Sequence, residues 1–370
     1  MWIEYAQLVF PQVEELSREL PVVLPLGKPL PARPGGLTEG ILLPPLPYGF
    51  ADPLLLDLRD ILGSLAQMLR EDGFQQLYLW GPLEVDGWQT LQAEIGPLQL
   101  PQGPIKVVPI GHTEQHGFHL PLATDTLIVE GLCKGRTDAL PAWPYGVSTH
   151  RRQFPGTLSL NPRAFEDFFV ELSGRLGRSG QTRVVFFLNG HGGNHSFLVN
   201  ACKFAGERYR DWLTATTFLH TASGAALEQM LHERSSQLMG HACELETSYL
   251  LALHPEQVHM DRAVDELDFC QSPEVRMDWL ESGALILNPP WSDDSKTGSY
   301  GAPRQASAEK GARWLKAARA ELQRLLEECQ QQWCQREARR SQGWTEGAWR
   351  ASWQELSARC SVQPPTGGGR

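Results

Sequence analysis

This sequence of 370 residues has no CxxC pair of cysteines, no basic run and no long apolar run. Its seven cysteines are scattered without a CxxC, so neither a disulfide framework nor a thiolate zinc site is expected, and a reducing compartment fits best. No apolar run approaches the roughly 18 residues that cross a bilayer, and the N-terminus has no basic segment before an apolar core. The net charge of −10, without basic–aromatic interleaving, argues against nucleic-acid binding. We therefore expect a cytoplasmic protein that binds neither membrane nor nucleic acid.

Apolar runs of strand length alternate along the chain with amphipathic runs of helical length. The expected strands include 21–27, 76–82, 106–111, 183–190 and 284–291. The expected helices include 1–20, 53–71, 162–177, 195–210 and 307–338. Asn161 and Ser307 are the expected N-caps of the helices that they precede. This alternation predicts an α/β fold with a mainly parallel sheet flanked by helices, and in such folds ligands gather at the C-terminal ends of strands.

The order of elements occurs twice, which suggests an internal repeat. VVLPLG (22–27) parallels KVVPIG (106–111), and PPLPYGF (44–50) parallels PAWPYGV (141–147). If this is a duplication, the first copy has lost its polar residues. The alternative is a chance likeness between αβ units.

Three segments of the chain follow from this pattern. The first is an N-terminal segment holding the extra, possibly degenerate repeat (1–104), the second the main domain (105–340), and the third a Trp-rich, partly disordered tail (341–370).

The stretch VVPIGHTEQHGFHLPLATD (107–125) places metal-capable side chains directly after an apolar strand. Glu114 and His116 are two residues apart on an extended segment, so their side chains share a face. Asp125 begins a helix, where its charge suits the helix N-terminus and where it can bridge two cations.

Two later stretches, LNGHGGNH (188–195) and HACELETS (241–248), have the same character. They add His191 after a second apolar strand, and His241 and Glu246. Taken singly, each of these residues has an ordinary structural explanation. Together, three carboxylates and two or three imidazoles suit one or two divalent ions, Zn²⁺, Mn²⁺ or Fe²⁺.

Five motifs then resemble, in order over about 105–335, those of the creatininase family of metal-dependent amidohydrolases; they are GHTEQHGFHLPLATDT, PYG…H…FPGTLSL, FLNGHGGN, HACELETS and TGSYGAPRQASAEKG. Residues 1–27 are similar to the family's opening helix and first strand. The resemblance implies a creatininase-like fold and ring-shaped homo-oligomers, often hexamers. It also implies four metal ligands, with Asp125 bridging two metals: Glu114, His116, Asp125 and His191. By the same resemblance, Glu246 and His241 fall on the family's ETS-motif glutamate and catalytic-type histidine.

One departure from the family concerns the substrate. Creatinine-hydrolysing members have Tyr and a ligating Glu after the NGH histidine, where this chain has Gly192 and Gly193. The second metal would then depend on Glu246. No tryptophan before His241 matches the substrate-stacking tryptophans of those members. Members with the GG pattern include a formamidopyrimidine-type deformylase and a peptidase acting on a small modified peptide.

The expected function is hydrolysis of a non-peptide C–N bond (amide, lactam or formamide) of a small molecule by metal-activated water. His241 or Glu246 would protonate the leaving nitrogen. His150 and Tyr145 are the candidate substrate-binding residues. His119 and His195 are expected to support the site rather than to bind metal. The alternatives are a peptidase for a small modified peptide and a metal-binding scaffold without turnover.

Overall fold

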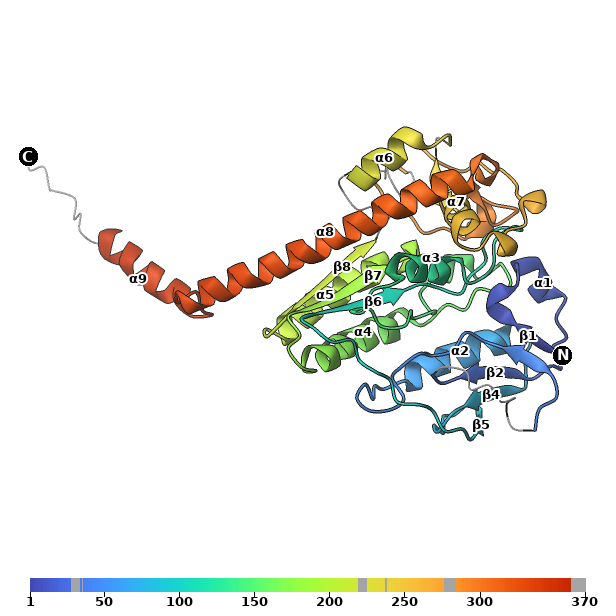
Figure 1. The fold of residues 1–370 in the computed structure, drawn as a ribbon, viewed down its shortest axis with the longest axis horizontal. Coiled ribbons are helices and arrows are strands. Elements are labelled where there is room, and N and C mark those ends of the chain that lie inside the picture. The colour runs from blue at the N-terminus through green and yellow to red at the C-terminus, as the bar shows by residue number, and fades with distance from the viewer. Residues whose placement is uncertain (28–33, 35, 219–224, 237, 276–283, 361–370) are drawn as a thin grey trace, which may run out of the picture.

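The computed structural model describes the chain from residue 1 to 360, except 28–33, 35, 219–224, 237 and 276–283. Two parallel sheets and one antiparallel strand pair form its framework (Figure 1). The N-terminal sheet has the order β1-β3-β2-β4-β5, the central sheet has the order β6-β7-β8, and β10 pairs antiparallel with β9. The expected α/β architecture with mainly parallel strands is therefore confirmed.

The strands are β1 (Trp2–Glu4), β2 (Val22–Pro25), β3 (Gly40–Leu42), β4 (Leu77–Trp80), β5 (Gln89–Leu91), β6 (Ile105–Ile110), β7 (Val184–Asn189), β8 (Leu213–Phe218), β9 (Met239–His241) and β10 (Tyr300–Gly301). The α-helices are α1 (Phe10–Glu14), α2 (Arg59–Glu71), α3 (Thr124–Cys133), α4 (Pro162–Gly177), α5 (His195–Arg208), α6 (Ala225–Glu233), α7 (Glu244–Leu253), α8 (Ala308–Ser341) and α9 (Ala348–Cys360). Asn161 and Ser307 cap α4 and α8 through their side chains, as expected.

The central sheet is covered on both faces, which explains why β7 is apolar along its whole length. Val184 and Phe186 point into the core formed with α3, α7 and α8. Val185 and Phe187 point the other way, into the core formed with α4 and α5. The alternation of a strand thus places successive residues in opposite layers.

The second of these cores continues without a break into the N-terminal unit, so the two sheets share it. The helices α2 and α4 lie between the sheets (Figure 1). The Tyr145 hydroxyl donates to the Pro44 carbonyl at 2.5 Å, and the Tyr48 ring lies 5.4 Å from that of Trp143. The N-terminal unit is therefore packed on the main domain rather than tethered to it.

Hydrogen bonds at corresponding residues support the internal repeat. In the first unit, Leu46 N–H donates to the Pro25 carbonyl and Gly27 N–H donates to that of Leu46, at 2.9 and 2.7 Å. In the second unit, Trp143 N–H donates to the Pro109 carbonyl and Gly111 N–H donates to that of Trp143, both at 2.9 Å. These are the positions that the proposed repeat pairs: Pro25 with Pro109, Gly27 with Gly111, and Leu46 with Trp143. Chance likeness between αβ units does not require this agreement.

Two expected elements differ from the structure. Residues 1–20 form a short strand, a 3-10 turn and the five-residue α1 instead of one helix. Their packing explains this, because the carbonyl of Leu8 accepts from Leu122 N–H and that of Ala6 accepts from Ala123 N–H, which ties the segment to the start of α3. The run 284–291 forms no strand; Leu285 makes one isolated bridge with Val275, and Ile286 is 95% exposed.

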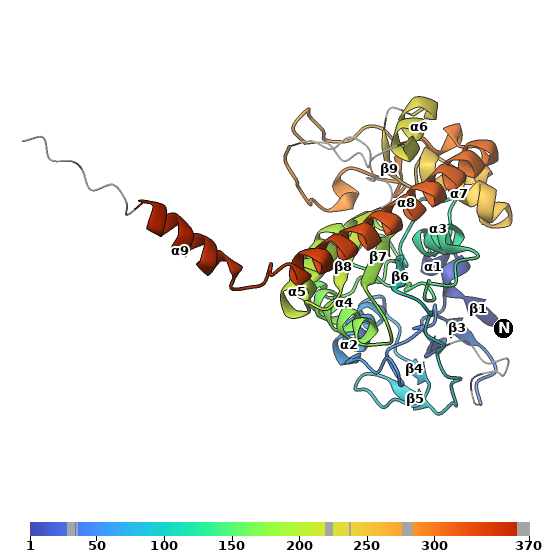
Figure 2. The same cartoon turned by 60° about the vertical axis from the view of Figure 1, so that its left-hand side comes forward.

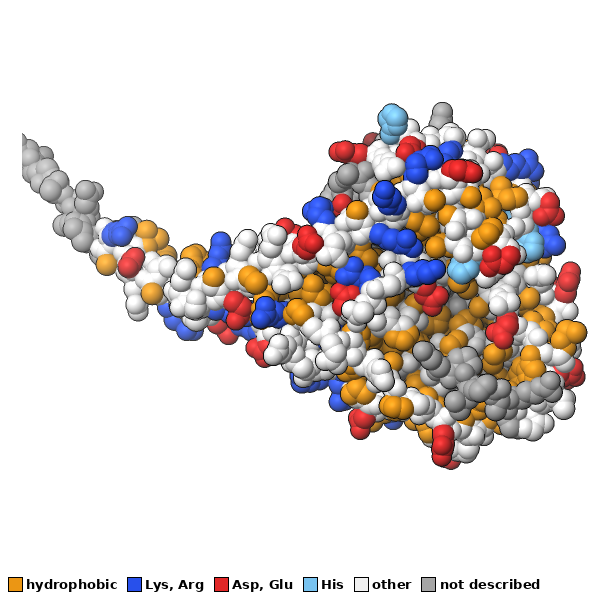
Figure 3. All heavy atoms as spheres, viewed as in Figure 1, with side chains coloured by type: hydrophobic (Ala, Val, Ile, Leu, Met, Phe, Trp, Pro, Cys, Tyr) orange, Lys and Arg blue, Asp and Glu red, His pale blue; other side chains and the backbone are white. Residues whose placement is uncertain are grey.

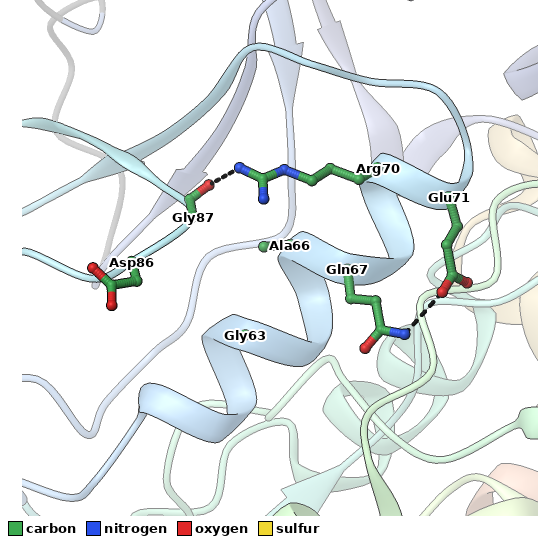
Figure 4. A pocket seen from close by; sticks show the side chains of 7 residues that line it. All are labelled: Gly63, Ala66, Gln67, Arg70, Glu71, Asp86 and Gly87. Carbon is green, nitrogen blue, oxygen red and sulfur yellow. Dashed lines mark hydrogen bonds between the residues drawn. The ribbon is translucent and has the colours of Figure 1, made fainter.

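The C-terminal helices extend away from the body. Figures 1 and 2 show α8 running along the central sheet and α9 projecting beyond it. Apolar side chains remain exposed on this arm, as Figure 3 shows, among them Trp349, Trp353 and Leu356. Residues 361–370, the expected disordered tip, lie outside the described residues. No helix within the described ranges combines the length and apolarity that crossing a membrane requires.

Candidate metal centre

Three segments that follow strands bring the predicted ligands together. Glu114 and His116 lie in the loop after β6, His191 follows β7, and Asp125 stands in the first turn of α3. Glu246 lies in the first turn of α7, after β9. All five residues are at most 3% exposed. The parallel strands β6 and β7 end at the same edge of the central sheet, which brings their loops together, whereas Glu246 comes from the separate β9–α7 segment.

The two oxygens of Asp125 face two different donor groups. Oδ2 lies 3.1 Å from His191 Nδ1, which is also 2.9 Å from Glu114 Oε1. Oδ1 lies 3.2 Å from His116 Nε2, which is 3.9 Å from Glu246 Oε1. Asp125 is thus shared between the Glu114–His191 group and the His116–Glu246 group.

The electrostatics of the cluster show a demand for positive charge. Burial alone would lower the pKa of His116, but Asp125 and the neighbouring carboxylates raise it to about 9. The pKa of His191 also rises to about 9, because Glu114 and Asp125 outweigh its desolvation. Burial would raise the pKa of the Asp125 carboxyl, but the two histidines lower it. Buried carboxylates need compensating charge, and divalent cations supply it; the donor set therefore fits a metal.

The three residues of the 146–148 segment make hydrogen bonds that hold the Glu114–His191 group and its neighbour His112 in place. Gly146 N–H donates to Nδ1 of His112 at 2.8 Å. The Val147 carbonyl lies 3.1 Å from His191 Nε2, and the Ser148 hydroxyl donates to Glu114 Oε2 at 2.8 Å. These hydrogen bonds orient the ring of His191 and the carboxylate of Glu114, as bonds to metal-binding residues commonly do in metal sites.

His241 lies beside both donor groups, and its hydrogen bond defines its tautomer. Nε2 is 2.7 Å from the Gln115 carbonyl, so Nε2 carries the proton and donates it. Nδ1 is left as the acceptor and lies 3.9 Å from Glu114 Oε1. The ring centroid is 4.2 Å from that of His116. His241 can therefore coordinate a metal or exchange a proton through Nδ1.

The remaining predicted residues lie in different surroundings. The ring centroid of His150 is 5.3 Å from that of Trp291. The Trp291 ring in turn contacts His241 edge to face, with centroids 5.8 Å apart, so Trp291 lies between His150 and the metal centre. Tyr145 is fully buried and its hydroxyl is bonded to Pro44, so we correct its assignment from substrate binding to core packing. His119 Nε2 lies 2.9 Å from the Thr247 hydroxyl, consistent with a supporting role.

Two residues of this site, His112 and Trp291, were not predicted from the sequence. His112 joins Glu114 and His191 in a group of donor atoms within 4.8 Å of one another. The alternation 112, 114, 116 along an extended segment was a signal that could have identified it. Trp291 had no such signal, because its segment joins the site only through tertiary packing.

The fold and this buried donor set define an α/β protein with a candidate metal site, and comparison with known proteins identifies its family. Residues 90–326 match the family model described as "Creatininase: Creatinine amidohydrolase". The match covers more than half of the chain, so this protein belongs to the creatininase family of hydrolases.

Among curated proteins, the mycofactocin precursor peptide peptidase of Mycolicibacterium smegmatis is 34% identical over 174 residues, which are 44% of this chain and 62% of that protein, less than two thirds of its length. The Mycobacterium ulcerans peptidase of the same name is 32% identical over 230 residues, 58% of this chain and 82% of that one. The creatinine amidohydrolase of Pseudomonas putida is 28% identical over 181 residues, 44% of this chain and 68% of that one.

Among solved structures, a candidate creatinine amidohydrolase from Bacteroides fragilis superimposes with a TM-score of 0.52 at 24% identity. The superposition covers 63% of this chain and 90% of that one. At this identity the likeness shows the fold alone.

Proposed function

We propose that this protein is a metal-dependent hydrolase that cleaves a C–N bond of amide, lactam or formamide type in a small molecule. The observation that carries the proposal is the position of Asp125, whose Oδ2 lies 3.1 Å from His191 and whose Oδ1 lies 3.2 Å from His116. A carboxylate shared in this way suits a two-metal hydrolytic site. The mixed carboxylate and imidazole donors are compatible with Zn²⁺, Mn²⁺ or Fe²⁺.

A divalent metal held here by Glu114, Asp125 and His191, with His116 and Glu246 for a second ion, would lower the pKa of water and polarise a substrate carbonyl. The residues of the chain supply the rest. His241 keeps its Nε2 proton on Gln115 and presents Nδ1 toward the cluster, so Nδ1 takes up a proton and delivers it to the leaving nitrogen. Burial of the donors keeps bulk water out and strengthens these interactions.

Glu246 is assigned as a ligand of the second ion in place of a carboxylate after His191. Gly193 has no room for a side chain, since a Cβ there would lie 2.2 Å from the Val147 oxygen and 2.5 Å from His191 Nε2. A glutamate at this position is therefore incompatible with the present course of the 146–148 segment. Glu246 Oε1 lies 3.9 Å from His116 Nε2, beside the second ion that it would bind. Because Glu246 is used as a ligand, proton transfer to the leaving nitrogen is assigned to His241.

A second candidate is a peptidase for a small modified peptide. The similarity to two mycofactocin precursor peptide peptidases, at 34% and 32% identity, favours it. Both candidates break a C–N bond with the same donor groups, so they differ in substrate and not in the expected chemistry.

Metal analysis combined with an activity screen tests the proposal. Purified protein should hold near-stoichiometric Zn, Mn or Fe, and hydrolysis should appear with lactams, cyclic ureides, formamides or short peptides. Glu114→Gln should abolish the activity. Glu130→Gln should not, because Glu130 lies on α3 but belongs to neither donor group. Protein without transition metal would contradict the hydrolase function. Metal without turnover on any substrate would favour the scaffold alternative.

Self-association is also part of the proposal. A homo-oligomer, with a hexamer as the form the family resemblance suggests, should elute well above 41.3 kDa in size-exclusion chromatography with light scattering. A monomer at micromolar concentration would contradict it.

A further inference from the structure

His112 is a buried imidazole beside the metal centre that the proposed reaction does not use. It follows Gly111 directly after β6, and its side chain is 0% exposed. One of its ring nitrogens lies within 4.8 Å of a Glu114 oxygen and a His191 nitrogen. An imidazole at this distance either coordinates metal or supports a residue that does.

The hydrogen bond from Gly146 separates these two roles. Gly146 N–H donates to Nδ1 of His112 at 2.8 Å. In a neutral imidazole one nitrogen accepts and the other carries the proton, so Nε2 of His112 is protonated. A protonated nitrogen cannot coordinate a metal, and coordination through Nδ1 would leave the buried Gly146 N–H without its acceptor. The hydrogen bonding therefore favours a supporting role.

The residue that His112 supports is His191. The two ring centroids lie 4.6 Å apart at an interplanar angle of 46°. The edge of the His191 ring contacts the Val147 carbonyl through Nε2. The tilted contact with His112 limits rotation of the His191 ring about χ2, a torsion that is otherwise broad for an imidazole.

We propose that His112 is a positioning residue, whose ring packs on that of His191 and keeps it at the angle at which Nδ1 faces the buried carboxylates. The inference rests on the proposed function, in which His191 binds metal. It predicts that the ring of His112 matters for metal affinity and that its nitrogens, as ligands, do not.

Titration of the full-length, metal-free protein with Co²⁺ tests this, with the Kd and the visible d–d absorption as readouts. His112→Phe keeps a ring against His191 but removes the acceptor, and it should retain the Co²⁺ spectrum and a Kd within about threefold of wild type. His112→Asn keeps an acceptor for Gly146 but removes the ring. It should weaken Co²⁺ binding about tenfold or more, the effect usual for residues that orient a ligand.

Two controls define the scale. His191→Ala removes the proposed ligand itself and should eliminate the d–d absorption of Co²⁺ bound at the Glu114–His191 group. His254→Asn changes an imidazole outside the donor groups, whose Nδ1 lies 3.5 Å from Glu256, and should leave Co²⁺ affinity unchanged. Thermal unfolding of each metal-free variant separates loss of affinity from loss of fold, and if one His112 variant does not fold, the other still decides.

The outcomes are distinct. Wild-type affinity in His112→Asn would overturn the positioning role. Loss of Co²⁺ in folded His112→Phe as complete as in His191→Ala would make His112 a ligand, and this would overturn it as well. Unchanged Co²⁺ binding in His191→Ala would instead contradict the proposed function, whatever the His112 variants do.

Discussion

The carboxylate of Glu246 accepts a hydrogen bond of 2.5 Å from the main-chain N–H of Ala242. Ala242 has a φ of 47°, in the left-handed region that residues with a Cβ rarely occupy. Its position between β9 and α7 turns the chain back, so that this N–H points at a side chain one helical turn later. Strain of this kind clusters at functional sites, and here it orients a candidate ligand.

Relief of the strain at Ala242 is the first prediction. Ala242→Gly should leave metal content unchanged and raise the free energy of unfolding by up to about 1 kcal/mol, since an L-residue in this region costs roughly 1–2 kcal/mol. Ala242→Val, whose branched side chain is more strained there, should lower both. Urea unfolding and metal analysis of the two variants measure this. Equal stability of the glycine and valine variants would contradict it.

The sharing of Asp125 predicts different metal stoichiometries for two carboxylate variants. Asp125→Asn removes a donor from both groups, so metal per chain should fall toward zero. Glu246→Gln affects only the group containing His116, so about one ion should remain. Elemental analysis after dialysis against a weak chelator distinguishes them. Identical losses in the two variants would exclude separate donor groups. Glu266→Gln, a carboxylate outside the cluster, is a matched control for metal content.

The metal-free protein should lose stability as pH rises. His116 and His191 have pKa values near 9 in the folded chain, above the unfolded value of about 6.5. Their contribution is therefore complete below pH 6.5 and disappears as pH passes through about 9. Melting temperatures of chelator-treated protein at pH 6.5, 8 and 9.5 should decrease in this order. Loaded protein should not follow this order, because a bound metal requires these imidazoles to be deprotonated.

Asp72, at the end of α2 in the N-terminal unit, should destabilise the protein at neutral pH. Burial raises the pKa of its carboxyl to about 6, although Arg18 acts against this. Because the folded pKa exceeds the unfolded one, the contribution becomes unfavourable as pH rises from about 4 to 6. Asp72→Asn should therefore raise the free energy of unfolding at pH 7 by about 1–2 kcal/mol. Its benefit should vanish near pH 4.

Asp57→Asn is the matched control for this prediction. Hydrogen bonds from Arg59 lower the pKa of the Asp57 carboxyl, so the shift has the opposite sign, and the pair is solvent-exposed. An exposed pair of this kind contributes at most about 1 kcal/mol. Asp57→Asn should change stability at pH 7 slightly or lower it. A gain equal to that of Asp72→Asn would show that burial of Asp72 is not the cause.

Local sequence patterns were sufficient to predict many of the secondary-structure elements and the candidate metal ligands of this protein. The apolar run of β7, the N-caps Asn161 and Ser307, and the order of strands and helices are all properties of neighbouring residues. The two-residue spacing of Glu114 and His116 likewise determines a shared face wherever the segment is extended. The metal-ligand candidates were therefore accessible from sequence, because each is a chemically conspicuous residue at a strand end.

Tertiary structure alone decided how these residues combine. Sequence placed Tyr145 in a pocket, but its hydroxyl is bonded to Pro44 in the N-terminal unit. It did not identify His112 or Trp291 as neighbours of the site, since Gly146 and His241 reach them from distant segments. The division of donors around Asp125 depends on contacts between β6, β7, α3 and α7. Sequence by itself was enough to name the candidate metal ligands. Which of them share Asp125 was decided only by long-range packing, since distances between segments are not encoded in local spacing.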